Sequence, residues 1–181
     1  MSMILTTARL KLFSCTSEIA EAALIDKSQI ENLLGVRVSD DWYTSEVQDF
    51  LPEYALMSRS EELLQGWGLW LMINQRERVL IGDLGFGGKP DETGTVEIGY
   101  EVLEAYRHQG YALEAALELV DWALTQRSVK RIIAHCTPDN LASIQILKKL
   151  GMQQIASVYL PLFPSVLICK WELSRCDLLV S

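Results

Sequence analysis

Residues 95–103, TVEIGYEVL, alternate between apolar and polar side chains with a period of two. The apolar positions are Val96, Ile98, Tyr100 and Val102. This alternation predicts a half-buried β-strand. The loop sequence YRHQG follows at 106–110, and from about Ala112 to residue 126 the spacing becomes that of an amphipathic helix. The loop is therefore expected at the N-terminus of a helix, directly after a strand.

The same two periodicities predict the other elements of the chain. Besides 95–103, we expect strands at 8–15, 66–74, 78–88, 130–136, 153–160 and 165–173. Helices are expected at 16–34, 39–58, 112–126 and 138–150, with Ser17 and Asp139 as N-caps and an interruption near Pro52. The third helix has an apolar stripe of Leu113, Leu117, Val120 and Leu124, with Ala116 and Ala123 beside it. The order β-α-α-β-β-β-α-β-α-β-β predicts an α/β (α+β) domain spanning 1–181. Its central sheet would be mixed and mostly antiparallel, with helices on both faces and a parallel crossover where a helix separates two strands.

Charge and cysteine usage exclude several classes of function. The net charge is -8 and the isoelectric point is about 4.8, which argues against general nucleic-acid binding. The four cysteines form no CxxC pair and only two histidines are present, so no metal site is predicted. Cys136 and Cys169 are expected to be reduced core thiols. The N-terminal residues do not resemble a signal peptide and no run could span a membrane, so we expect a cytoplasmic protein.

The segment 106–115, which contains the loop and the start of the helix, has the chemistry of an anion site despite the acidic total. The first N–H groups of a helix lack intrahelical partners and carry the positive end of the dipole. Gly110 and Ala112 allow a ligand to approach the backbone closely, and Arg107 adds a fixed charge. The alternative is an ordinary strand-to-helix turn with an exposed arginine, because one glycine near a helix start is a weak signal.

Three segments together resemble a known family. They are TTARLKLF at 6–13, VEIGYEVLEAYRHQGYALEA at 96–115 and NLASIQILKKLGM at 140–152. In this order and spacing they are similar to the GCN5-related N-acetyltransferases (GNAT), and more narrowly to the branch that contains the ribosomal-protein N-terminal acetyltransferases. The resemblance implies the GNAT fold and acetyl-CoA as co-substrate. In this family the central strand is typically splayed from the next strand, and the pantetheine arm of acetyl-CoA pairs with the central strand.

The resemblance also implies a set of cofactor-binding residues. Backbone groups near Tyr100 and Val102 would pair with pantetheine, and Asn140 would bond to it. Ser143 would lie near the sulfur. The pyrophosphate would lie on the backbone N–H groups of Gln109, Gly110, Tyr111 and Ala112, with Arg107 and His108 nearby.

Catalysis needs a group that takes a proton from the amine and a group that protonates the thiolate. Glu97 resembles the general base of other members, although it would otherwise be a solvent-facing carboxylate. The tyrosine that is the usual acid is replaced by Leu147, which leaves Ser143 as the candidate acid. Ser143 could instead bond only within the first turn of its helix. Tyr159 is a further candidate donor.

The acceptor is left open at this level. A protein N-terminus, a polyamine, an amino sugar and an antibiotic all remain, as does a homodimer. Trp42, Phe50 and Tyr54 could line an acceptor pocket or simply pack against the sheet. The acidic residues Asp40, Asp41, Glu46 and Asp49 could attract a cationic amine or form a solvated face. A non-catalytic acyl-CoA-binding module is the alternative function, because Leu147 offers no hydroxyl.

Overall fold

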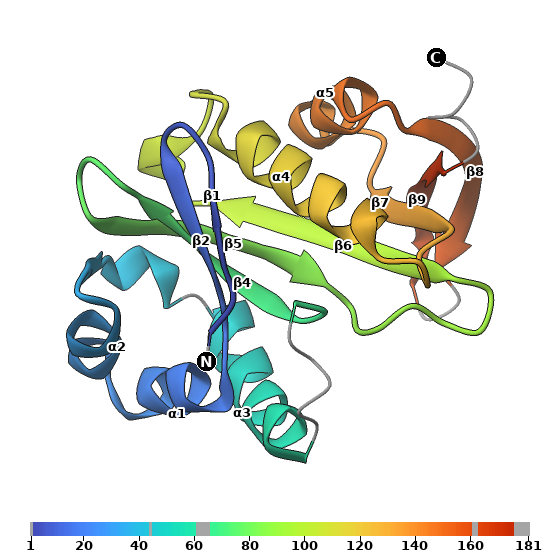
Figure 1. Cartoon of the computed structure of the whole chain (residues 1–181). Coiled ribbons are helices and arrows are strands. Elements are labelled where there is room, and N and C mark those ends of the chain that lie inside the picture. The colour runs from blue at the N-terminus through green and yellow to red at the C-terminus, as the bar shows by residue number, and fades with distance from the viewer. Residues whose placement is uncertain (1, 44, 61–65, 161–162, 176–181) are drawn as a thin grey trace.

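The computed structural model describes residues 2–43, 45–60, 66–160 and 163–175. Its strands form one mixed sheet in the order β1-β2-β4-β5-β6-β7-β9-β8, with β3 paired to β5 beside this path. Helices α4 and α5 lie on one face, and α1, α2 and α3 lie on the other (Figure 1). The predicted fold class, a mostly antiparallel sheet with helices on both faces, is confirmed.

The N-terminal third departs from the prediction in three places. A strand β1 (Ile4–Thr6) precedes the expected one, β2 (Leu10–Ser14), and pairs with it. The single helix expected at 16–34 is two helices, α1 (Ser17–Ile25) and α2 (Lys27–Leu34). Asp26 separates them, because its extended backbone (φ -169°) ends α1 while its side chain caps α2 by accepting from Gln29. Thr16, and not Ser17, caps α1.

The next segment contains the short strand β3 (Arg37–Val38), a 3-10 turn (Asp40–Trp42) and helix α3 (Ser45–Ser60). The predicted interruption at Pro52 is wrong, since α3 continues through this residue. An interior proline removes one N–H bond and its ring crowds the carbonyl four residues earlier, but α3 is also held by its packing against α1. Trp42 and Tyr54 are buried in the core on this face, as expected for packing, whereas Phe50 is 48% exposed.

The central strands agree with the prediction. β4 (Leu69–Asn74) and β5 (Val79–Phe86) form the expected hairpin, and β6 (Thr95–Val102) pairs antiparallel with β5. In β6, Val96, Ile98 and Val102 are buried, whereas Glu97, Gly99 and Glu101 are exposed. The alternation read from the sequence therefore sets which residues of β6 enter the core.

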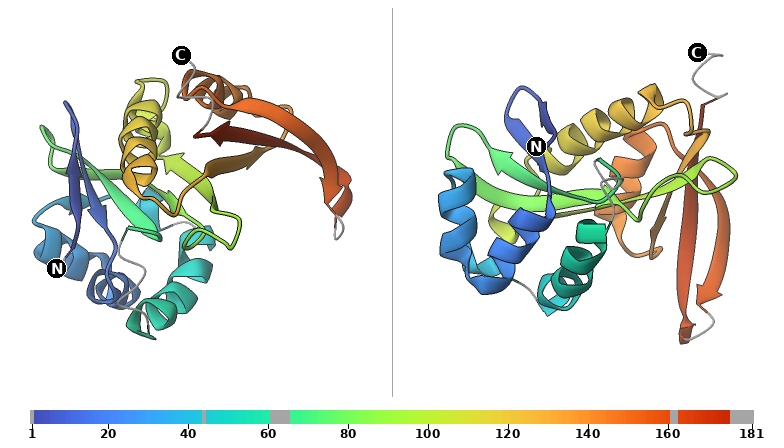
Figure 2. Two further views of the ribbon diagram at one scale, coloured as in Figure 1. Left: turned by 45° about the vertical axis from the view of Figure 1, so that its right-hand side comes forward. Right: turned by 60° about the horizontal axis from the view of Figure 1, so that its bottom comes forward.

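The C-terminal half contains α4 (Tyr111–Thr125), β7 (Arg131–Cys136), α5 (Leu141–Lys149), β8 (Gln153–Leu160) and β9 (Phe163–Ser174). β8 and β9 form a long ribbon that projects beyond the rest of the sheet (Figure 2). The apolar stripe predicted for α4 is wrong in part. Leu117 is 42% exposed, and the buried face consists of Tyr111, Ala115, Ala116, Leu119, Val120 and Ala123. The small alanine side chains let α4 lie close to the sheet. The face of α4 that packs on the sheet is therefore set by the alanines and not by the stripe of larger leucines.

The crossover rule also holds only in part. β6 and β7, which α4 joins, are parallel as predicted. β2 and β4, which three helices join, are antiparallel, because the helical layer returns the chain to the sheet at the end where it left. β9 lies between β7 and β8.

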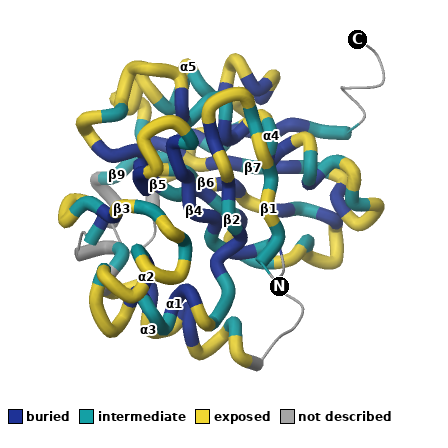
Figure 3. The backbone as a smooth tube through the Cα atoms, turned by 60° about the vertical axis from the view of Figure 1, so that its left-hand side comes forward, coloured by how far each residue is buried: buried dark blue, intermediate teal, exposed yellow. Residues whose placement is uncertain are grey.

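Buried residues follow the strands and the inner faces of the helices (Figure 3). Among the residues described, no helix is both long and apolar enough to cross a bilayer.

One partly buried acid, Asp83, gives a stability prediction. Burial raises the pKa of Asp83 to about 6, while the hydrogen bond from Trp42 Nε1 (2.8 Å) lowers it and Glu101 raises it further. The pKa of Asp83 in the folded protein thus lies above the ordinary 3.8. The stabilisation that comes from protonated Asp83 is therefore full below about pH 4 and is lost as the pH rises through about 6.

Asp83→Asn should therefore raise the free energy of unfolding by about 1–3 kcal/mol near pH 8 and leave it almost unchanged near pH 4. Asparagine keeps an acceptor for Trp42 and removes the charge. Urea denaturation at the two pH values measures the difference. An equal gain at both would contradict the assigned cause.

Candidate active site

Two adjacent strands separate in the middle of the sheet. β6 and β7 pair only over Thr95–Glu97 and Arg131–Ile133, although both strands continue beyond this point. The splay implied by the resemblance is present. The carbonyl of Glu97 and the N–H of Leu103 are bonded on the β5 side of β6. Because alternate residues direct their backbone groups to opposite neighbours, those of Tyr100 and Val102 point into the gap.

A cleft of about 860 Å³ continues from this gap. The end of β6, the loop before α4 and the first turns of α4 and α5 line it. From the predicted cofactor set, the lining includes Tyr100, Val102, Arg107, His108, Gly110, Tyr111, Ala112, Asn140 and Ser143. Gln109 is in the loop but is not part of the lining. The structure thus brings together residues that are about forty positions apart in the sequence.

The loop before α4 presents its backbone to the cleft. His108 (φ 59°) and Gly110 (φ 82°) are both in the left-handed region. Gly110 is the N-cap of α4 and gives it no side-chain cap. The first N–H groups of a 15-residue helix are therefore left for another acceptor, which is the arrangement that binds phosphate.

Arg107 lies at the edge of this loop. Its Nε donates to the carbonyl of Val102 at 2.8 Å, and its Nη2 lies 3.6 Å from Glu101 Oε1. The guanidinium is thus held at the end of β6 and not over the N-terminus of α4. A phosphate contact by Arg107 stays a prediction, and it would require this side chain to turn.

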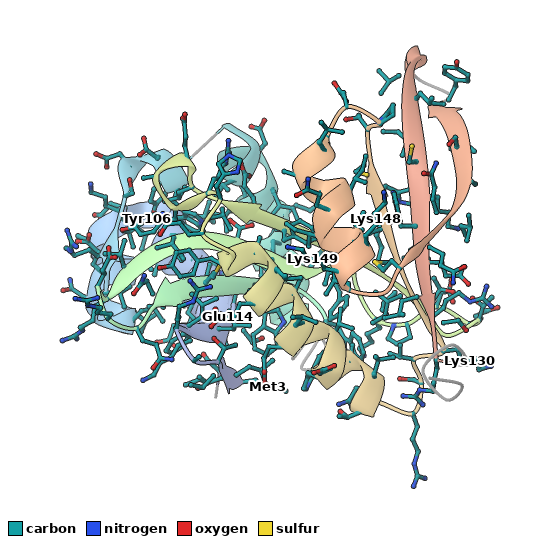
Figure 4. All side chains as sticks on the ribbon, turned by 90° about the horizontal axis from the view of Figure 1, so that it is seen from above. Met3, Tyr106, Glu114, Lys130, Lys148 and Lys149 are labelled. Atoms are coloured by element: carbon teal, nitrogen blue, oxygen red, sulfur yellow. The ribbon has the colours of Figure 1, made fainter. Side chains whose placement is uncertain are left out.

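A second arginine, which the sequence reasoning missed, supports the loop from outside. Arg9 Nη1 donates to the carbonyl of Gln109 (3.0 Å), and its guanidinium lies 4.3 Å from the centre of the Tyr111 ring. Its Nε pairs with Glu114 at 2.6 Å, near the start of α4 (Figure 4). Glu114 also accepts from Thr7 Oγ1 at 2.6 Å. Burial alone would raise the pKa of Glu114, but the bonds from Thr7 and Arg9 hold it below its usual value.

The sequence did contain a signal for this contact. Thr7 and Arg9 lie in the TTARLKLF segment that carried part of the resemblance, but no role followed from it. The contact fixes the turn between β1 and β2 against the loop. Lys149, at the C-terminal end of α5, was also missed; it lines the cleft. Figure 4 shows it between α5 and α4.

At the start of α5, Asn140 takes the capping role predicted for Asp139. Its Oδ1 accepts from the N–H of Ser143 at 3.0 Å. Asn140 and Ser143 both line the cleft, as expected from their spacing. The capping bond leaves the amide nitrogen of Asn140 as the group available to donate to a ligand.

Two hydroxyl groups bridge the gap between β6 and α5. The hydroxyl of Tyr100 lies 2.9 Å from Oγ of Ser143, and burial raises the pKa of Tyr100. Sequence reasoning had used only the backbone of Tyr100. Leu147, at the position of the usual tyrosine, is fully buried. Tyr159 is 63% exposed and does not line the cleft.

Glu97 lies on the other face of β6. Its Oε1 is 2.6 Å from Nδ1 of His135 on β7. Gly99 follows on the same face, where a Cβ atom would meet no atom within 4 Å. The predicted acid and the predicted base are therefore on opposite faces of the sheet, on either side of the gap.

The cysteines have the environment of core residues. Cys15, Cys136 and Cys169 are free and buried, and burial raises the pKa of Cys136. Cys176 lies outside the described residues. Among those residues no group of three or more His, Cys, Asp or Glu side chains could hold a metal ion.

Comparison with known proteins decides the family. The acetyltransferase (GNAT) domain model matches residues 27–153. The chain belongs to the GNAT family. The Bacillus subtilis (strain 168) protein YjdG, described as an uncharacterized N-acetyltransferase, is 33% identical over 149 residues, which cover 82% of this chain and 89% of YjdG. The chain is thus an N-acetyltransferase, and acetyl-CoA is its co-substrate.

Solved GNAT structures share the fold at low sequence identity. The ribosomal-protein-S5-alanine acetyltransferase from Vibrio fischeri superposes with a TM-score of 0.68 at 15% identity, over 97% of this chain and 98% of that one. RimL, a ribosomal L7/L12 α-N-protein acetyltransferase solved with coenzyme A, gives 0.67 at 17% identity, over 95% and 98%.

Proposed function

We propose that this GNAT enzyme transfers the acetyl group directly from acetyl-CoA to a primary amine, with both substrates bound together. The observation that carries the proposal is the splay between β6 and β7. It opens toward the cleft on one face and toward Glu97 on the other. A thioester lying in the gap would meet the donor-binding residues on one side and the incoming amine on the other.

The cofactor would occupy the cleft in the order of its chemical groups. Its pyrophosphate would accept from the backbone N–H groups of residues 109–112, with His108 and Lys149 nearby. The pantetheine arm would pair with the backbone of Tyr100 and with the N–H of Val102, whose carbonyl accepts from Arg107, in the manner of an added strand. Asn140 would donate to the arm through its amide nitrogen.

The transfer step needs a base on the acceptor side and an acid beside the sulfur. We assign deprotonation of the amine to the Glu97 site. The Tyr100–Ser143 hydroxyl pair would protonate the thiolate, because both groups lie in the gap. This pair replaces the hydroxyl that Leu147 does not provide, which removes the reason for a purely binding role.

The acceptor class is a protein N-terminus or a small-molecule amine. Two proteins of the same fold are named as acetyltransferases of ribosomal proteins. We therefore propose a protein N-terminus as the first acceptor class to test. A cytoplasmic location, a homodimer and a single domain over 1–181 stay predictions from the sequence. The test is CoA-thiol release with purified protein and a panel of an N-terminal serine peptide, an N-terminal alanine peptide, spermidine, glucosamine and an aminoglycoside. Thiol release no faster with any amine than without it would contradict transfer to these classes.

Asn140 and Ser143 should differ in which step they affect. Asn140→Ala should raise the KM for acetyl-CoA by about threefold to tenfold, since a lost neutral hydrogen bond is worth about 0.5–1.5 kcal/mol. Ser143→Ala should lower kcat with little change in that KM, because it removes the hydroxyl beside the sulfur. Steady-state kinetics with the best amine of the panel separate the two. A fully active Ser143→Ala would assign the proton to Tyr100 alone or to solvent.

A further inference from the structure

Glu97 and His135 lie where β6 and β7 separate. Glu97 is the last residue of β6 in register with β7, opposite Ile133. His135 follows two positions later on β7, so it shares the face of Ile133. The Nδ1–Oε1 distance is 2.6 Å, while the side chains keep exposed fractions of 32% and 49%. The two groups form a close pair that solvent and an acceptor can reach.

We propose that His135 is the catalytic base and that Glu97 is the residue that positions it. This inference rests on the proposed function and deepens it. An ionised carboxylate only accepts hydrogen bonds, so the proton between the two groups must be on Nδ1. Nε2 then carries the lone pair, and no group in the described part of the chain donates to it. The free basic atom of the pair belongs to His135.

The space beside the pair suits an incoming amine. Gly99 is the next residue on the Glu97 face of β6. A Cβ atom built there would meet nothing within 4 Å. β7 is no longer paired to β6 at this level. An acceptor could therefore approach the gap over Gly99, with the imidazole on its flank.

His135 and the Tyr100–Ser143 hydroxyl pair divide the proton transfers of the reaction. Nε2 takes a proton from the ammonium form of the acceptor, and the Glu97 carboxylate stabilises the resulting imidazolium. The neutral nitrogen attacks the thioester carbon, which forms the C–N bond. The C–S bond then breaks, and the Tyr100–Ser143 hydroxyl pair supplies a proton to the thiolate. The second proton of the nitrogen passes through solvent to that pair and restores it. The imidazolium releases its proton to solvent.

The experiment compares His135→Gln, His135→Ala, Glu97→Gln and the His135→Gln/Glu97→Gln double variant. The assay is CoA-thiol release at saturating acetyl-CoA with the most reactive amine of the panel. His135→Gln should lower kcat by about a hundredfold to ten-thousandfold and leave the acetyl-CoA dissociation constant unchanged. The double variant should be no slower than His135→Gln alone, because residues that act as one unit are not additive. Added imidazole should restore turnover to His135→Ala and not to Glu97→Gln.

Two results would overturn the assignment while the enzyme remains an acetyltransferase. One is wild-type kcat in His135→Gln. The other is a double variant slowed by the product of the two single effects, which would mean independent roles. A wild-type protein that binds acetyl-CoA but acetylates none of the amines would instead overturn the proposed function, and with it the base. Circular dichroism of each variant separates these outcomes from loss of the fold.

Discussion

Glu97→Gln is expected to lower turnover by about a hundredfold to ten-thousandfold. Glutamine retains the size of the side chain and an oxygen that can accept from Nδ1 of His135, 2.6 Å away. Only the negative charge is lost, and that charge is needed to accept the proton or to stabilise an imidazolium. Acetyl-CoA affinity should not change, because Glu97 does not line the cofactor cleft. Steady-state kinetics together with calorimetry measure both quantities.

Glu92→Gln is the matched control for this variant. Glu92 is exposed and lies in the turn before β6. Its substitution removes the same charge at a position away from the site. It should retain wild-type turnover. If Glu97→Gln retained it as well, at neutral pH and with the best acceptor, solvent or another group would have to deprotonate the amine.

Gly110→Asp is expected to weaken acetyl-CoA binding by about thirtyfold or more, corresponding to about 2 kcal/mol. A Cβ at this position meets only Nη2 of Arg9, at 3.5 Å, so a severe clash is not the cause. The carboxylate would instead place a negative charge at the N-terminus of α4, where the pyrophosphate is proposed to bind, and would compete for Arg9. Isothermal titration calorimetry measures the change.

Gly110→Asn separates charge from backbone conformation. Asparagine has nearly the same shape and must adopt the same positive φ of 82°, which costs either side chain a similar amount. The asparagine variant should therefore lose much less affinity than the aspartate variant. Equal losses would assign the effect to the loop conformation, and unchanged affinity in both would place the pyrophosphate elsewhere.

The sequence predicted those parts of the site that depend on local pattern. The alternation along β6 placed Tyr100 and Glu97 on opposite faces, and the YRHQG loop was placed at the start of α4. Both follow from short-range geometry, since a strand has a period of two and a glycine can begin a helix at positive φ. The motif spacing also brought Asn140 and Ser143 to one cleft.

Contacts between distant segments could not be predicted in this way. Arg9 reaches Gln109 and Glu114 across about a hundred positions of sequence, and the pairing of His135 with Glu97 depends on the parallel register of β6 and β7. No local period encodes either. The break at Asp26 was missed for a different reason: its capping bond interrupts a helical pattern that is otherwise continuous.

The most direct test of the account is to follow a labelled acetyl group from acetyl-CoA in a single turnover with the most reactive amine of the panel. Direct transfer predicts that the label leaves the thioester and appears on the amine nitrogen at the same rate, with none bound covalently to the protein at any time. Label accumulating on the protein before the amine would contradict direct transfer. A thioester that stays intact with every amine would contradict the assigned acceptor class.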